Sequence, residues 1–276
     1  MASAPARRSR SEVPVARFVL PVSGAMVSLH QPTGADDVLL TEHRVDDPAL
    51  ALALAERLGR AKPALDWSQL PVCDIDTLIV RLRQALIGDR VTADVPCADA
   101  ACGQRVDVSF GIDAYLMHHR PRPGRANRST DAPGWFVLPA KPAAADAVRF
   151  RLPTLADQIA VDGLPDAVAG LTMRCVQGAG PRSGRLRGQV EAAIAALAPV
   201  LAGPLQGQCP HCATPIAAWF LARRYCLQEL QDRARFIYDD VNTLAERYHW
   251  SERAILTLPH MRRTSYAERA RQARLG

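Results

Sequence analysis

Residues 18–37 read FVLPVSGAMVSLHQPTGADD, and residues 136–158 read FVLPAKPAAADAVRFRLPTLADQ. Both stretches open with Phe-Val-Leu-Pro, continue through a short alternating apolar segment, and close on Pro-Thr-x-Ala-Asp. The pattern predicts a β-hairpin in each stretch, with its second strand ending at the proline. The threonine and the aspartate three residues later then predict a helix that begins with a capping box. The residues in these roles are Thr33 with Asp36 and Thr154 with Asp157.

The similarity between the two stretches continues downstream in the same order. An Ala/Leu-rich helix is predicted from Asp47-Pro48 to Gly59, and a comparable segment from Leu164-Pro165 to Gly178. A second helix follows in each case, and a cysteine pair comes after it. The apolar stripes of the second helices are Ile75, Leu78, Ile79, Leu82 and Leu86, then Val190, Ile194, Leu197 and Leu201. Four matches in one order predict a duplicated unit.

The expected fold class is therefore α+β, with two tandem related halves and a helical C-terminal extension. Each half would consist of a β-hairpin, helices and a cysteine-pair zinc knuckle. The expected parts are a disordered basic tail at 1–12, a first half at 13–117, a linker at 118–134, a second half at 135–248 that ends in a long helix, and a helical docking segment at 249–276.

Four of the seven cysteines form two close pairs, Cys97 with Cys102 and Cys209 with Cys212. Zinc prefers four soft ligands in a tetrahedron, and a tight turn between paired cysteines places two thiolates on one ion. The sequence predicts one structural zinc, held by one pair from each half. Because four cysteines leave no open position for water, a catalytic zinc is not expected.

Other interpretations of the cysteines stay open. CPHC alone could be a redox dithiol, although no thioredoxin-like βαβ pattern surrounds it. The cysteines could also be small buried apolar residues, or His211 could replace one ligand.

Residues 217–248 lack Pro and Gly, which predicts one long helix with a heptad stripe. The stripe consists of Leu227, Leu230, Ala234, Ile237, Val241, Leu244 and Tyr248. It either packs on the chain's own core or docks a partner helix or a second copy. Beyond it, an aromatic and basic cluster is the expected partner-binding surface. Its members are Tyr248, His249, Trp250, Arg262, Arg263 and Tyr266.

The composition excludes some functional classes. The chain has 276 residues and a net charge of +6, with arginines concentrated in the tail, the linker and the C-terminus. No apolar run is long enough for a membrane span, and the N-terminus has no apolar stretch of a secretory signal. Phosphate-binding glycine loops, G-x-S-x-G and H-E-x-x-H are absent, so no enzyme activity is expected.

The FVLP and PTGAD segments, the CPHC pair and the closing LAERYHWSERAILTLPHMRRTSY, residues 244–266, together resemble the baseplate proteins of contractile phage tails. T-even-type phages carry members of that family at the baseplate hub, and phage-like contractile injection systems contain related proteins. The resemblance extends over nearly the whole chain and is most specific over residues 248–266.

The resemblance implies a non-enzymatic structural or assembly component whose partners are other baseplate or hub proteins. It implies cytoplasmic assembly, followed either by incorporation into the particle or by release, and it leaves self-association open. The alternative from another class is a zinc-dependent nucleic-acid-binding module. Only Arg105 lies close to either cysteine pair, and interleaved aromatic residues are absent, so nucleic acid is the less expected partner.

Overall fold

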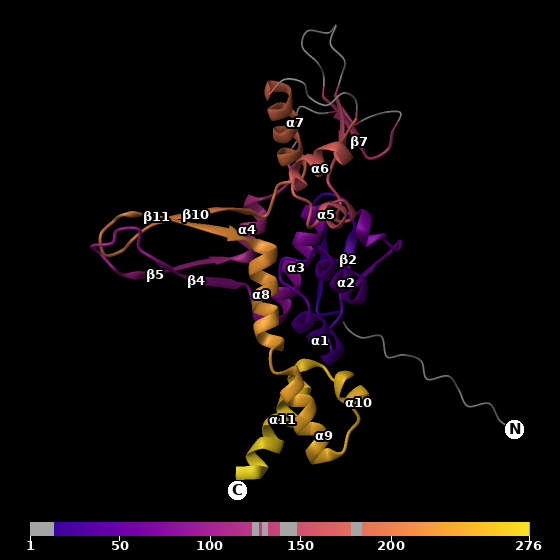
Figure 1. Ribbon diagram of the computed structural model, residues 1–276, viewed down its shortest axis with the longest axis vertical. Helices are drawn as coiled ribbons and strands as arrows, with labels where there is room; N and C mark the ends of the chain where they lie inside the picture. The colour runs from indigo at the N-terminus through magenta and orange to yellow at the C-terminus, as the bar shows by residue number, and fades with distance from the viewer. Residues whose placement is uncertain (1–13, 123–126, 129–131, 139–147, 178–183, 276) are drawn as a thin grey trace, which may run out of the picture.

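The computed structural model describes residues 14–122, 127–128, 132–138, 148–177 and 184–275. This part of the chain combines helices with several small antiparallel sheets, so the α+β class is confirmed (Figure 1). The tail predicted at residues 1–12 lies outside the described residues.

The N-terminal body is a three-stranded antiparallel sheet covered by helices. The strand order is β1-β2-β3, and the first two strands form the predicted hairpin. The predicted capping box is also confirmed, because the Thr33 N–H donates to Asp36 Oδ2 at 2.8 Å. The elements are β1 (Ala16–Val19), β2 (Met26–Leu29), α1 (Gly34–Glu42), α2 (Pro48–Leu58), β3 (Gly59–Ala61) and the 3₁₀ helix η1 (Trp67–Gln69).

A second antiparallel sheet follows, in the order β6-β7-β8-β9. Its β7–β8 hairpin and the Thr154–Asp157 capping box are those predicted. Part of the predicted linker is not a linker, because Asn127–Arg128 pairs with β7. The elements are β6 (Asn127–Arg128), β7 (Trp135–Leu138), β8 (Val148–Arg151), α5 (Leu155–Val161), α6 (Ala167–Cys175), β9 (Val176–Gln177) and α7 (Gly184–Leu197). The expected stripe on α7 ends at Leu197, since Leu201 lies beyond the helix.

Two long hairpins project from the body in the same direction (Figure 1). Each consists of two seven-residue strands and leads directly into a helix. The elements are α3 (Val72–Ile87), β4 (Arg90–Pro96), β5 (Arg105–Gly111) and α4 (Ile112–His118), then β10 (Ala202–Gln208), β11 (Pro215–Leu221) and α8 (Ala222–Ala234).

The main hydrophobic core lies where α3 and α8 pack against each other and against the N-terminal body. The predicted stripe of α3 supplies fully buried residues such as Leu78 and Ile79, and α8 supplies Leu227 and Leu230. Burial of each such side chain contributes roughly 1.5–3 kcal/mol. Helix α3 leads into the β4–β5 hairpin, and α8 follows the β10–β11 hairpin. The packing of these two helices in one core therefore fixes the bases of both hairpins.

The prediction of one long helix over residues 217–248 was wrong. Residues 217–221 belong to β11, and the helical part is divided into α8 and α9 (Ile237–Tyr248) by a turn at Arg235 and Phe236. A straight helix would keep the whole stripe on one face. Instead Leu230 enters the main core, while Leu244 enters a separate core among the C-terminal helices. These leucines are buried inside the chain and do not form a docking stripe.

The remaining C-terminal helices are α10 (Glu252–Leu256) and α11 (His260–Leu275). Ser251 caps α10, with its Oγ accepting from the Ala254 N–H at 3.3 Å. The last helix begins at His260, directly after Pro259. Together with α9 these helices form a compact unit at the end of the molecule (Figure 1).

Candidate metal centre

The four paired cysteines meet at the ends of the two hairpins. Their Sγ atoms all lie within 4.8 Å of one another. Two of these distances join the two hairpins: Cys97 Sγ lies 3.6 Å from Cys212 Sγ, and Cys102 Sγ lies 3.9 Å from Cys209 Sγ. A tetrahedron with metal–sulfur bonds of about 2.3 Å has sulfurs roughly 3.8 Å apart. The donor set therefore fits one four-coordinate ion.

The two cysteine loops are built alike. The first cysteine of each pair directly follows a strand, Cys97 after β4 and Cys209 after β10. Its backbone N–H donates across the loop at 2.9 Å, to the carbonyl of Gln104 in one loop and of Thr214 in the other.

The residue after the second cysteine completes the turn in both loops. Gly103 has φ 60° and Ala213 has φ 59°, in the left-handed region. Glycine adopts this conformation without cost, whereas alanine is strained there. A left-handed residue at the same place in two loops of different length turns both second cysteines back toward the first ones.

The surroundings shift the pKa values of the thiols in different directions. Against a lowering backbone hydrogen bond in each case, burial and hydrogen bonds to other thiols raise the pKa of Cys97 to about 12 and also raise that of Cys102. Cys209 is buried on Val106 and Ile216, Cys97 and Cys102 are half-buried, and Cys212 is exposed. Hydrogen bonding to the side chain and backbone of Thr214 lowers the pKa of the Cys212 thiol to about 6. Because the thiolate is the metal-binding form, this residue is prepared for coordination at neutral pH.

The structure bears on the other interpretations of the cysteines. Burial as small apolar residues accounts for Cys209 alone among the four. His211 is exposed and does not belong to the cluster of possible ligands among the described residues. The cysteines outside the cluster, Cys73, Cys175 and Cys226, are buried in other places.

The predicted partner-binding residues have different environments. Tyr248, Trp250 and Tyr266 contact one another, with ring centroids 5.1 Å apart for Tyr248 and Trp250 and 5.2 Å apart for Trp250 and Tyr266. His249 and Arg262 are exposed. The aromatic rings pack the C-terminal helices together, and part of their surface remains accessible.

Arg263 corrects the prediction, because its side chain is only 1% exposed. It lies 2.6 Å from Asp37 and 3.2 Å from Asp240, so it holds α11 to α1 and α9 and is not available to a partner. Sequence reasoning missed this network. Asp37 follows the recognisable capping aspartate Asp36, but no local pattern links it to an arginine 226 residues away.

No family model, no curated protein and no solved structure matches this chain. Within the described part of the chain, no helix has both the length and the apolar character needed to cross a membrane.

Proposed function

We propose that the four cysteines bind one structural zinc ion, and that this ion joins two related halves into a rigid scaffold. The observation that carries the proposal is the convergence of Cys97 and Cys102 with Cys209 and Cys212, over sequence separations of 115 and 107 residues. Zinc is the usual ion for a closed four-thiolate site.

Equivalent hydrogen bonds support the relation between the halves. In each half an arginine lies one residue before the end of a helix, α2 in the first half and α6 in the second. Its Nε donates to the capping aspartate. Arg57 Nε lies 2.6 Å from Asp36 Oδ1, and Arg174 Nε lies 2.8 Å from Asp157 Oδ1.

The two hairpins also end alike. Each leads directly into a helix whose first N–H donates to the residue just before the hairpin: Ile112 to the carbonyl of Asp89 and Ala222 to that of Leu201. Equivalent bonds of this kind are expected of a duplicated unit, and a shared metal would then lie between its two copies.

For the chain as a whole, we propose a non-enzymatic structural or assembly role in the baseplate of a contractile phage tail or a phage-like contractile injection system. The support is the resemblance of residues 244–266 to that protein family, together with a closed metal site that leaves no position for a substrate. The exposed parts of the Tyr248 and Trp250 cluster remain a candidate contact for baseplate partners.

The test is complementation in a bacterium that produces the particle. Deleting the gene should leave tubes and sheaths without complete baseplates in electron micrographs, and the wild-type gene should restore them. A gene carrying Cys97→Ser should fail to restore them, whereas one carrying Asp46→Asn, an exposed change distant from the cysteines, should succeed. Normal particles after the deletion would refute the baseplate role, and full rescue by Cys97→Ser would refute the structural role of the metal.

A further inference from the structure

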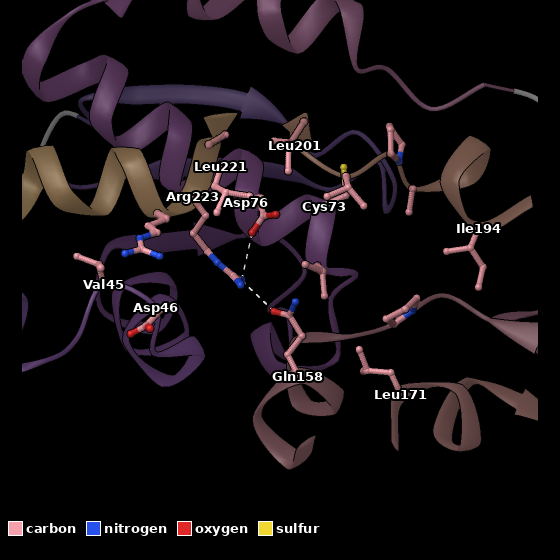
Figure 2. A pocket seen from close by; sticks show the side chains of 18 residues that line it. Val45, Asp46, Cys73, Asp76, Gln158, Leu171, Ile194, Leu201, Leu221 and Arg223 are labelled. Carbon is pink, nitrogen blue, oxygen red and sulfur yellow. Dashed lines mark hydrogen bonds and ion pairs between the residues drawn. The ribbon is translucent and has the colours of Figure 1, made fainter. Parts of the chain in front are cut away.

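A cavity of about 410 Å³ lies between the two halves, away from the cysteines. Its walls come from the start of α3, the start of α8, the segment before and within α5, and the connection from α7 to β10. Figure 2 shows labelled side chains from both halves facing this space, among them Val45, Leu171 and Ile194. Cavities that bind small molecules have this size and a mostly apolar lining.

Apolar side chains at the cavity are left uncovered. Val200 is 65% exposed and Leu221 is 41% exposed, and both line the cavity. Covering such surface is favourable in proportion to the apolar area removed from water. An aliphatic group is therefore the part of a ligand that these walls would accept.

The charged and amide side chains that line the cavity are Asp76, Arg223 and Gln158, together with Asp46 and Arg224. Arg223 Nη1 donates to Gln158 Oε1 at 2.9 Å and lies 3.2 Å from Asp76 Oδ1 (Figure 2). The Asp76 side chain is 10% exposed, and no described residue donates a hydrogen bond to its Oδ1. A buried carboxylate oxygen without a donor carries an unfavourable desolvation cost, which a ligand N–H would relieve.

The charges limit what the ligand's head group can be. A cationic head would be repelled by Arg223, and an anionic head would be repelled by Asp76. A neutral carboxamide fits both, because its N–H can donate to Asp76 while its oxygen accepts from the guanidinium. Gln158 already presents a carboxamide oxygen to Arg223 in this way.

We propose that this cavity binds a neutral aliphatic amide, with its chain among the apolar walls and its amide beside the Asp76–Arg223 pair, contacting both side chains. This site is separate from the metal centre and does not depend on the proposed scaffold role. An amide in this position would contact both halves at once, so its binding would stabilise their relative placement.

The test is an NMR titration of the full-length ¹⁵N-labelled protein with three probes of matched chain length: hexanamide, hexanoate and hexylammonium. Hexanamide should bind tightest and shift the amide signals of cavity residues. Asp76→Asn, which keeps the shape but removes the charged acceptor, should weaken hexanamide roughly 10-fold, as expected for one hydrogen bond to a charged group. Asp113→Asn, an exposed carboxyl that pairs with Arg81 and does not line the cavity, should change the affinity less than twofold.

A second variant tests the apolar part of the cavity. Ala198→Phe places a large side chain into the space and should abolish binding while the metal content and the dispersion of the spectrum stay unchanged. Tighter binding of hexanoate or hexylammonium, or equal binding of hexanamide by Ala198→Phe, would overturn the proposal. So would the absence of any cavity shift with hexanamide.

Discussion

Arg263 Nη2 donates to Asp37 Oδ2 across 2.6 Å, and both side chains are only 1% exposed. This buried ion pair joins the last helix of the chain to the first. The ion pair is incompletely hydrogen-bonded, because Arg263 Nη1 and Asp37 Oδ1 are buried without a hydrogen-bond partner among the described residues. The C-terminal helices are therefore part of the folded body, and their removal would leave Asp37 buried without its cation.

Arg263→Ala should destabilise the protein by about 3 kcal/mol, because it leaves the buried Asp37 carboxylate with only His260, whose Nδ1 lies 3.3 Å from Asp37 Oδ2. The free energy of unfolding from urea titrations measures this. Arg262→Ala is the matched control, since the neighbouring arginine is exposed and its loss should cost less than about 0.5 kcal/mol. A combined Asp37→Asn and Arg263→Met variant should be more stable than Arg263→Ala. Equal effects of Arg262→Ala and Arg263→Ala would contradict this account.

Arg57 and Arg174, which each contact a capping aspartate through Nε, should differ in their effect on stability when they are replaced. Arg57→Ala leaves Asp36 with only the Thr33 hydrogen bonds, so a cost of about 1–2 kcal/mol is expected. Arg174→Ala should cost at most about 1 kcal/mol, because Asp157 keeps a second arginine, Arg151, whose Nη2 lies 2.8 Å from it. Thermal unfolding of both variants shows which of them loses more stability. A larger loss of stability for Arg174→Ala would show that the arginines do not stabilise the two capping boxes as described.

The buried carboxyl of Asp76 predicts a pH dependence of stability. Desolvation, only partly offset by Arg223, raises its pKa from 3.8 to about 6. Between these values the folded state binds more protons than the unfolded state, so this group's contribution to stability is lost as the pH rises through about 6.

Asp76→Asn should remove that loss. It should stabilise the protein at pH 7.5 by an amount on the order of 2 kcal/mol and change its stability little at pH 4. Urea unfolding at both pH values tests this. A variant that is destabilised at pH 7.5 would mean that Asp76 is held by donors that favour its charged form.

The sequence predicted what local chemistry determines. The hairpins at β1–β2 and β7–β8 and both capping boxes follow from turn, proline and threonine positions that act over a few residues. The meeting of the cysteines was also predictable, because two thiol pairs at corresponding points of two similar stretches of sequence have few alternatives in a four-ligand site.

The errors share a physical cause. The stripe through Leu230 and Leu244 is consistent with one helix, and only tertiary packing into two separate cores shows that the chain turns at Phe236. The prediction that Arg263 is accessible to a partner was wrong for the same reason, because the burial of its side chain depends on a distant aspartate. The cavity around Asp76 likewise has no sequence signature, since its walls come from segments far apart in the chain.

The metal centre makes a paired prediction about its ligands. Cys97→Ser and Cys209→Ser should lower the free energy of unfolding to a similar extent, because each removes one ligand of the proposed ion from a different hairpin. Native mass spectrometry should find less metal in both variants. Cys226→Ala, a change in the main core, should keep the full metal content even if it loses stability. Loss of metal from only one of the two serine variants would indicate separate sites.

Zinc K-edge X-ray absorption on the purified protein measures the ligand shell itself. One zinc per chain with four sulfur neighbours at about 2.3 Å is the predicted result. A shell containing nitrogen or oxygen, or a protein that carries no zinc when purified without chelators, would contradict the joining of the two hairpins by a single closed thiolate centre.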